Sequence, residues 1–265
     1  MRVMLSSSIS YRLVSQNLDR SLDTIAKKPD VAREIAYYKA NIGNVKTIDD
    51  FLNNRRLYTF AMKAAGLEDM TYAKAFMRKV LTEGIDNPNS FANKLTDQRY
   101  SDFAATFNFA RNGEDTTSST AVQQDVVDNY VRQTLEVDTG QQSEGARLAL
   151  YFERKASTIN SAYDILADKA LLQVFQTAFS IPSATSLMDI DKQADMIEKK
   201  MDLADLQDPD KLQKFLTRFT SLYDAQNTTN TSIASAVTLL RAGRTSIGIS
   251  SDVLSAIQSL KFGGR

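Results

Sequence analysis

Apolar side chains recur along this chain at spacings of three and four residues, which place them on one face of a helix. Gly, Pro and polar capping residues separate the apolar segments. Alternation of apolar and polar positions over the length of a strand is hard to find. The pattern therefore predicts an all-α, multihelical fold with little or no sheet. The expected helices cover residues 8–27, 29–42, 48–65, 71–82, 88–95, 98–110, 122–135, 146–156, 161–179, 189–203, 208–224 and 252–260.

The chain also repeats itself. Residues 32–67 align without a gap on residues 146–181 at a constant offset of 114, with seven identities in 36 positions. Further on, residues 87–96 match residues 208–217 at an offset of 121, and a seven-residue insertion in the second copy accounts for the change. Internal duplication is a property of architecture. It predicts two tandem, divergent helical repeats that pack together.

The repeat divides the chain into segments. Two polar stretches, residues 112–120 and 224–231, have the composition of exposed linkers. The predicted organisation is an N-terminal amphipathic helix (1–31), a first repeat (32–110), a linker with a connecting helix (111–145), a second repeat (146–224) and C-terminal helices (225–265).

The composition excludes several classes of partner but does not point to one particular function. The 265 residues are 43% hydrophobic, enough for a large core, and carry 32 basic and 32 acidic side chains. This balance disfavours nucleic acid and anionic lipid as partners. No apolar run approaches the roughly 20 residues that span a bilayer, and the N-terminus lacks the apolar stretch of a secretory signal. We therefore expect no membrane insertion and no cleaved signal peptide.

Catalytic chemistry is scarce in this sequence. It contains no Cys and no His, which removes thiol nucleophiles, thiolate metal sites and the commonest general base. No glycine-rich phosphate loop occurs. The acids Asp205, Asp208 and Asp210 are better explained as a helix cap and first-turn residues than as a cation site. We expect no enzyme activity, no cofactor and no metal.

The two ends of the chain offer the best candidates for partner binding. Both carry amphipathic helices that are rich in Ser, Gln and Asn. One interpretation is that these helices pack on the central ones, and the other is that they stay exposed and pair with helices of other proteins. The candidate partner-binding residues are Ile9, Leu13, Leu18 and Leu22 at one end and Val253, Leu254, Ile257 and Leu260 at the other.

Two segments of the first half carry a family resemblance. They run from Thr47 to Leu67 and from Asn87 to Tyr100, and the second includes the sequence Asp97-Gln98-Arg99-Tyr100. They resemble an uncharacterised alphaproteobacterial family that carries a domain of unknown function. Members of that family are multihelical and are often encoded among flagellar basal-body and motility genes. The resemblance extends over residues 8–224, although the second copy does not retain the Asp-x-Arg-Tyr segment.

The resemblance implies an all-α fold and a flagellar context, and brings no catalytic residues with it. The leading hypothesis is a non-enzymatic structural or assembly protein of the bacterial flagellum, exported without a cleaved signal. Its expected partners are other proteins, with a homo-oligomer left open. The alternative is a cytoplasmic chaperone-like or regulatory module that holds a peptide in an aromatic-lined groove. That groove would lie around Phe103, Phe107 and Phe109, or around Tyr151 and Phe152.

Overall fold

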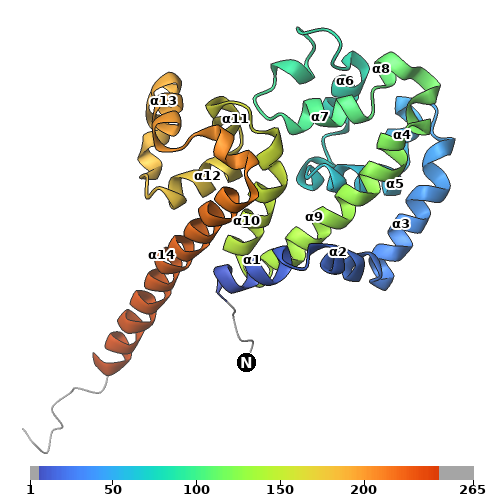
Figure 1. The fold of residues 1–265 in the computed structure, drawn as a ribbon. Coiled ribbons are helices and arrows are strands. Elements are labelled where there is room, and N and C mark those ends of the chain that lie inside the picture. The colour runs from blue at the N-terminus through green and yellow to red at the C-terminus, as the bar shows by residue number, and fades with distance from the viewer. Residues whose placement is uncertain (1–5, 245–265) are drawn as a thin grey trace, which may run out of the picture. The chain divides into compact units, whose positions relative to one another are not determined.

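The described part of the chain is helical. The computed structural model describes residues 6–244, with side chains in residues 6–227, and these residues form no strand (Figure 1). This confirms the predicted all-α, multihelical fold. The chain divides into two units, residues 1–223 and residues 224–265. In the second unit, the described residues continue the helix α14 (Pro209–Arg244).

The first unit contains two hydrophobic cores. The elements that contribute to the first core are α2 (Leu18–Ala26), α3 (Pro29–Asn41), η1 (Ile42–Asn44), α4 (Ile48–Asn53), α5 (Arg55–Ala64), η2 (Glu68–Met70), α6 (Lys74–Glu83), η3 (Ala92–Lys94), α7 (Arg99–Thr106), α8 (Phe109–Asn112), η4 (Gly113–Ser118), the π-helical turn η5 (Ala121–Asp125) and α9 (Val126–Gly140). The elements around the second core are α1 (Ser7–Ser15), α10 (Glu144–Lys155), η6 (Ala156–Thr158), α11 (Ala162–Ala167), α12 (Lys169–Ala178), η7 (Ser183–Leu187), α13 (Ile190–Lys200), η8 (Leu203–Gln207) and the start of α14.

Helix α9 connects the two cores. It packs against α2 and α5 on the side of the first core and against α10 on the side of the second (Figure 1). The N-terminal helices follow the same division, because Tyr11 of α1 is buried in the second core and Ile25 of α2 in the first. The segment that begins the chain therefore braces both halves.

Most of the aromatic residues that the sequence suggested as the lining of a peptide groove are buried in the two cores. Phe103 and Phe107 are buried and stack on Phe51, with ring centroids 6.3 and 4.7 Å from it. Phe109 and Phe152 are also buried. These rings mainly fill the cores, because burying large apolar rings against one another stabilises a helical core strongly. Phe103, Phe107 and the half-buried Tyr151 also line a cleft.

The order of elements recurs along the chain. Each bound of α11 and α12 lies 114 residues after the corresponding bound of α4 and α5, and η6 follows η1 at the same distance. The local chemistry recurs as well. Thr47 forms a capping box with Asp50, and Ser161 forms one with Asp164. This recurrence supports the predicted duplication, which stays a prediction.

Three of the predicted helices each form two helices in the structure. The segment 8–27 divides between α1 and α2, because Asn17 leaves helical geometry and its side-chain amide donates to the Leu13 carbonyl oxygen at 3.3 Å. The segments 48–65 and 161–179 divide where Asn54 and Asp168 cap α5 and α12. Polar residues that bond to nearby backbone compete with helix continuation.

The helix expected over residues 88–95 is absent. Only the short turn η3 forms there. The Asn87 side-chain oxygen accepts from the backbone N–H of Asn89, and the amide of Asn93 donates to the carbonyl oxygens of Ile85 and Asn87. These bonds hold the segment as a loop. In the second half, by contrast, Asp208 caps α14 as expected, and Pro209 opens it.

The two polar stretches are not linkers. Within residues 112–120, Thr117 is buried and its hydroxyl donates to the carbonyl oxygen of Val45 at 2.9 Å. The stretch 224–231 continues α14 in helical geometry. No Gly or Pro stands between residues 210 and 242 to end that helix, so polarity alone was a poor guide to a break.

A buried ion cluster joins α9 to α10. Glu136 of α9 is 1% exposed. Its carboxylate accepts from the Arg154 guanidinium at 2.7 and 2.9 Å and from Arg132 at 3.3 Å. Burial lowers the pKa of Arg154, but the bonds and charge of Glu136 together with the charges of Tyr151 and Asp168 outweigh this effect and raise that pKa. A buried charge of this kind is tolerated because both of its partners are cations.

Replacing Glu136 by Gln keeps the size of the side chain and removes the charge that both arginines face. We expect the free energy of unfolding to fall by about 3 kcal/mol, because breaking a buried ion cluster leaves uncompensated charge. Urea denaturation followed by far-UV circular dichroism measures this loss. The matched control is Asp102→Asn, which removes a 63% exposed carboxylate and should cost less than about 1 kcal/mol. Equal losses in the two variants would contradict the prediction.

Candidate functional site

Helix α1 turns its polar side inward. Ser7, Ser10 and Tyr11 are buried, and the Ser143 hydroxyl donates to the Ser7 hydroxyl oxygen at 2.8 Å. The approach to α10 is close, since a Cβ placed on Gly145 would lie 2.5 Å from the Ser7 hydroxyl oxygen. Small side chains therefore allow α1 to dock closely on α10.

The opposite side of α1 leaves apolar side chains in solvent. Ile9 is 56% exposed and Leu13 is 60% exposed. Of the other residues predicted at this end, Leu18 and Leu22 are half-buried and pack against the first core. The structure thus brings only Ile9 and Leu13 together on an exposed face. The residues predicted at the other end, Val253, Leu254, Ile257 and Leu260, lie outside the described residues.

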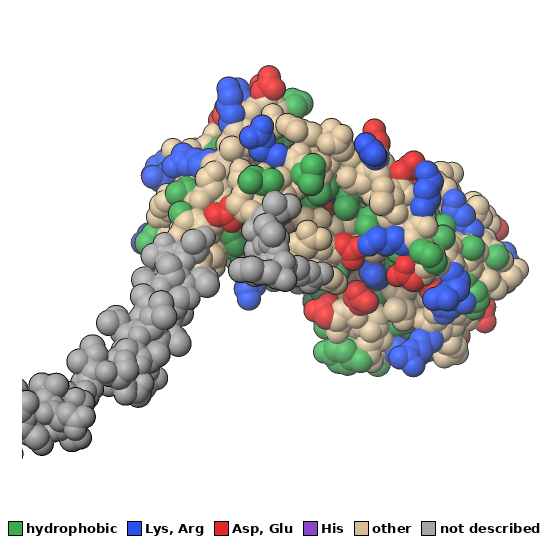
Figure 2. Space-filling view, turned by 90° about the horizontal axis from the view of Figure 1, so that it is seen from below, with side chains coloured by type: hydrophobic (Ala, Val, Ile, Leu, Met, Phe, Trp, Pro, Cys, Tyr) green, Lys and Arg blue, Asp and Glu red, His purple; other side chains and the backbone are tan. Residues whose placement is uncertain are grey.

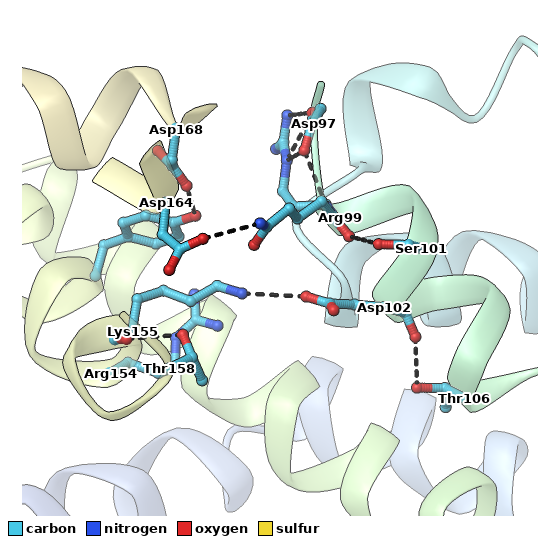
Figure 3. Close-up of polar contacts among 12 residues, drawn as sticks. Asp97, Arg99, Ser101, Asp102, Thr106, Arg154, Lys155, Thr158, Asp164 and Asp168 are labelled. Carbon is cyan, nitrogen blue, oxygen red and sulfur yellow. Dashed lines mark hydrogen bonds and ion pairs between the residues drawn. The ribbon is translucent and has the colours of Figure 1, made fainter. Parts of the chain in front are cut away.

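A cleft lined by both polar and apolar side chains lies between the two cores, where α7 meets α5, α9 and α10 (Figure 3). Arg99 stands at its edge, within the Asp97-Gln98-Arg99-Tyr100 segment that carries the family resemblance. Its guanidinium donates to both carboxylate oxygens of Asp97, at 2.7 to 3.1 Å, and to the carbonyl oxygen of Gly66 at 2.5 Å. Burial raises the pKa of Asp97, but the bonds from Arg99 hold that pKa below its ordinary value.

The same segment reaches across to the second half. The Gln98 side-chain amide donates to Asp164, the acid of the second capping box, at 3.2 Å. Lys155 of α10 donates to Asp102 of α7 at 3.3 Å, as Figure 3 shows. Gln98 and Asp102 therefore tie the first half of the chain to the second.

The chemistry of the cleft is that of a structural junction. Its volume is about 240 Å³. The cations Arg99, Arg154 and Lys155 are each bonded to a carboxylate of the same chain. Tyr151 donates to Asp168 at 2.5 Å, and burial, followed by the charge of Asp168, raises the pKa of its hydroxyl. A hydroxyl with a raised pKa stays protonated, so it is a poor nucleophile or base.

Charge elsewhere on the described surface is mixed. Figure 2 shows basic and acidic side chains interspersed over the visible face. The acids considered as a cation site are engaged locally, because Asp208 accepts from the backbone of Asp210 and Lys211, and Asp205 pairs with Lys211 at 2.6 Å. Within the described residues, no group of carboxylates is arranged to hold a metal. The helices of that same part include none with the length and apolarity that crossing a membrane requires.

Sequence reasoning missed a second exposed apolar surface. Leu187, Met188 and Ile190 flank Asp189, the residue that caps α13, and Leu187 is 91% exposed. A signal for this surface was present in the sequence. Met188 directly precedes the cap residue Asp189, and the first turns of α13 offer no apolar side chain at the position that would pack on it. The position that would pack on Met188 is Gln193, whose amide donates to the Met188 carbonyl oxygen at 2.8 Å.

Replacing Arg99 by Lys keeps the charge and loses the planar fork that binds Asp97 and Gly66. We expect a loss of about 1 kcal/mol and a melting temperature lower by about 2–4 °C. Differential scanning calorimetry checks the shift. The control is Arg55→Lys on the exposed start of α5, which should change the melting temperature by less than about 2 °C. An Arg99 variant with an unchanged melting temperature would contradict a stabilising role for the bonds to Asp97 and Gly66.

Comparisons with known proteins agree with this fold. The X-ray crystal structure of protein AGR_C_984 from Agrobacterium tumefaciens, a structural-genomics target, is 52% identical in sequence with a TM-score of 0.78. The match covers 86% of this chain and 98% of that chain. No curated protein matches the chain significantly. A family model described as "Protein of unknown function (DUF1217)" matches residues 64–212. The resemblance to an alphaproteobacterial family of unknown function is thereby confirmed, and the chain belongs to the DUF1217 family.

Proposed function

We propose that this protein is a non-enzymatic helical component of the bacterial flagellar system, with a structural or assembly role. It acts through helix-to-partner contacts made by its terminal segments. The flagellar context comes from the family resemblance in the sequence, and the contact surface comes from the described N-terminal helix.

The observation that carries the proposal is the outward face of α1. Ile9 and Leu13 stand one helical turn apart and are both more than half exposed. Fully burying a side chain of this size contributes about 1.5–3 kcal/mol relative to leaving it in water. A helix docked on one side and apolar on the other supplies one half of a helix-in-groove contact.

The scarcity of catalytic groups supports a role without enzyme activity. The sequence has neither His nor Cys. In the cleft between the cores, the guanidinium and ammonium groups that could bind a substrate anion already bind carboxylates of the same chain. Cations that are already paired in this way are better suited to holding the two halves of the chain together than to binding and releasing a ligand.

The alternative, a cytoplasmic chaperone-like or regulatory module, keeps only part of the groove that the sequence suggested for it, because Phe103, Phe107 and Tyr151 line the cleft between the cores. Phe103, Phe107, Phe109 and Phe152 are buried within the cores. The apolar surface left for a partner at the N-terminal end is the α1 face. The two functions now differ mainly in where the protein is found in the cell.

Cell fractionation separates these two functions. We expect the protein in purified basal bodies or culture supernatant of wild-type cells, and in the cytosol alone when the flagellar export gate is disabled. Immunoblotting of the three fractions from both strains gives the answer. Protein confined to the cytosol in both strains would favour the chaperone-like or regulatory role.

A substitution in the α1 face tests the contact itself. Replacing Ile9 and Leu13 together by Asp should leave the fold intact, because both side chains are exposed, and should reduce swimming and flagellar number toward those of a gene deletion. Soft-agar motility and electron microscopy measure these effects. The control is Tyr72→Asp, a change at a 79% exposed apolar side chain away from α1. Normal motility in the double variant or in the deletion strain would overturn the proposal.

A further inference from the structure

Exposed apolar side chains are concentrated on two separate surfaces. Six of the seven large apolar side chains that the described residues expose lie on them, and the seventh is Tyr72. The first surface, called the α1 face, consists of Ile9, Arg12 and Leu13. The second, called the α13 face, consists of Tyr163, Leu187, Met188 and Ile190. Apolar side chains scattered singly need no explanation, but clusters mark interaction sites.

The α13 face is held in place by the local structure. Asp189 caps α13 by accepting from the backbone of Asp191 and Lys192, which fixes Met188 and Ile190 on either side of the cap. Tyr163 of α11 donates to the Asp191 carboxylate at 2.8 Å, so its ring lies beside the start of α13. The surface is therefore built from two packed helices and is preformed.

Acids border the α13 face along one side of its helix. Asp191, Asp195 and Glu198 follow spacings of four and three residues, which place them in one row. The bond with Asp191 and then the charges of all three acids raise the pKa of Tyr163. Neither Asp195 nor Glu198 has an ion-pair partner among the residues whose side chains are described. Helix α13 also carries Lys192, Lys199 and Lys200, but none of them pairs with Asp195 or Glu198, so these two carboxylates are available to a cation from outside.

The α1 face carries the complementary charge. Arg12 lies in the last turn of α1, between Ile9 and Leu13 on the exposed side. Within residues 6–227 its guanidinium forms no ion pair. The face thus presents two apolar side chains and one unpaired cation, and the α13 face presents apolar side chains beside unpaired acids.

We propose that the α1 face of one copy of this chain docks on the α13 face of a second copy, with Arg12 directed at the row of Asp195 and Glu198. Pairing of like faces is disfavoured, because it sets Arg12 against Arg12 or one acidic row against another. Since the two faces differ, each copy keeps one free face after docking. Such a heterologous contact propagates into a head-to-tail row of subunits.

The inference rests on the proposed function for its use of the α1 face, and it names the partner. Each surface is defined by only a few residues, far fewer than the roughly 20–30 residues that each partner contributes to a standard stable interface. We therefore expect weak association that appears at high protein concentration and dissociates on dilution.

Sedimentation velocity on the purified full chain tests the contact. The wild-type protein should sediment faster as its concentration rises, passing beyond the dimer. Ile9→Asp with Leu13→Asp removes one face, and Leu187→Asp with Ile190→Asp removes the other, so each double variant should stay monomeric. An equimolar mixture of the two double variants should form a one-to-one dimer and nothing larger, because only one pair of intact faces remains.

Charge reversal tests the proposed register. Arg12→Glu should weaken association at least tenfold, and so should Asp195→Arg with Glu198→Arg. In an equimolar mixture these two variants pair reversed faces with each other, which should restore association. Circular dichroism of every variant checks the fold, and Tyr72→Asp should associate like the wild type.

Several outcomes would overturn the inference. They are a wild-type protein that stays monomeric at all concentrations, a double variant that still forms rows, and a mixture of double variants that stays monomeric or grows beyond the dimer. If the protein is monomeric while the Ile9 and Leu13 double variant abolishes swimming, the second-copy partner is wrong and the flagellar role stands. If the protein associates but the Ile9 and Leu13 double variant swims normally, the second-copy partner stands and the flagellar role is wrong.

Discussion

The constraint on which the rest of the structure depends is the burial of one carboxylate between two helices. The buried Glu136 carboxylate bonds to the guanidinium groups of Arg132 and Arg154, and these three residues hold α9 against α10. Helix α9 also packs on α2 and α5, and α10 packs on α1 and α12. The ion cluster thus sets the position of both cores. Exposed ion pairs such as Lys155 with Asp102 refine this arrangement, but in solvent they contribute little.

The placement of α1 follows from that arrangement. Because Gly145 lies at the start of α10, the backbones of α1 and α10 can approach closely, and the small side chains of Ser7 and Ser10 fit between them. Tyr11 anchors the helix in the second core. The serine-bearing face of α1 is buried in this contact, and two large apolar side chains of the helix, Ile9 and Leu13, face solvent. A helix that would bury these two side chains in an ordinary domain here leaves them in solvent.

Much of the fold could be predicted from the sequence, because helix caps and apolar spacing are local signals. The capping boxes of Thr47 and Ser161 and the start of α14 at Pro209 are examples. Most of the failures come from polar side chains that bond to nonlocal or turn backbone, and the stretch 224–231 was misjudged because no Gly or Pro ends α14 there. Thr117 looked like part of a linker, yet it satisfies the Val45 carbonyl oxygen inside the core. The apolar spacing of residues 9 and 13 marked a helix correctly, but it could not say which face a serine-lined contact would bury.

The second exposed face follows from the way the two halves differ. Helix α6 buries Met77, Val80 and Leu81 under α7 and α8. Helix α13 buries Ala194 and Ile197, which stand 117 residues after Met77 and Val80, but the position 117 residues after Leu81 is the exposed Glu198. The main neighbours of α13 are α11 and η7. One half therefore covers its helix from within the chain, and the other carries an acid where the first has a leucine. A chain whose halves are covered unequally has two different ends, and that asymmetry permits head-to-tail contact where a pair of equivalent halves would favour a closed dimer.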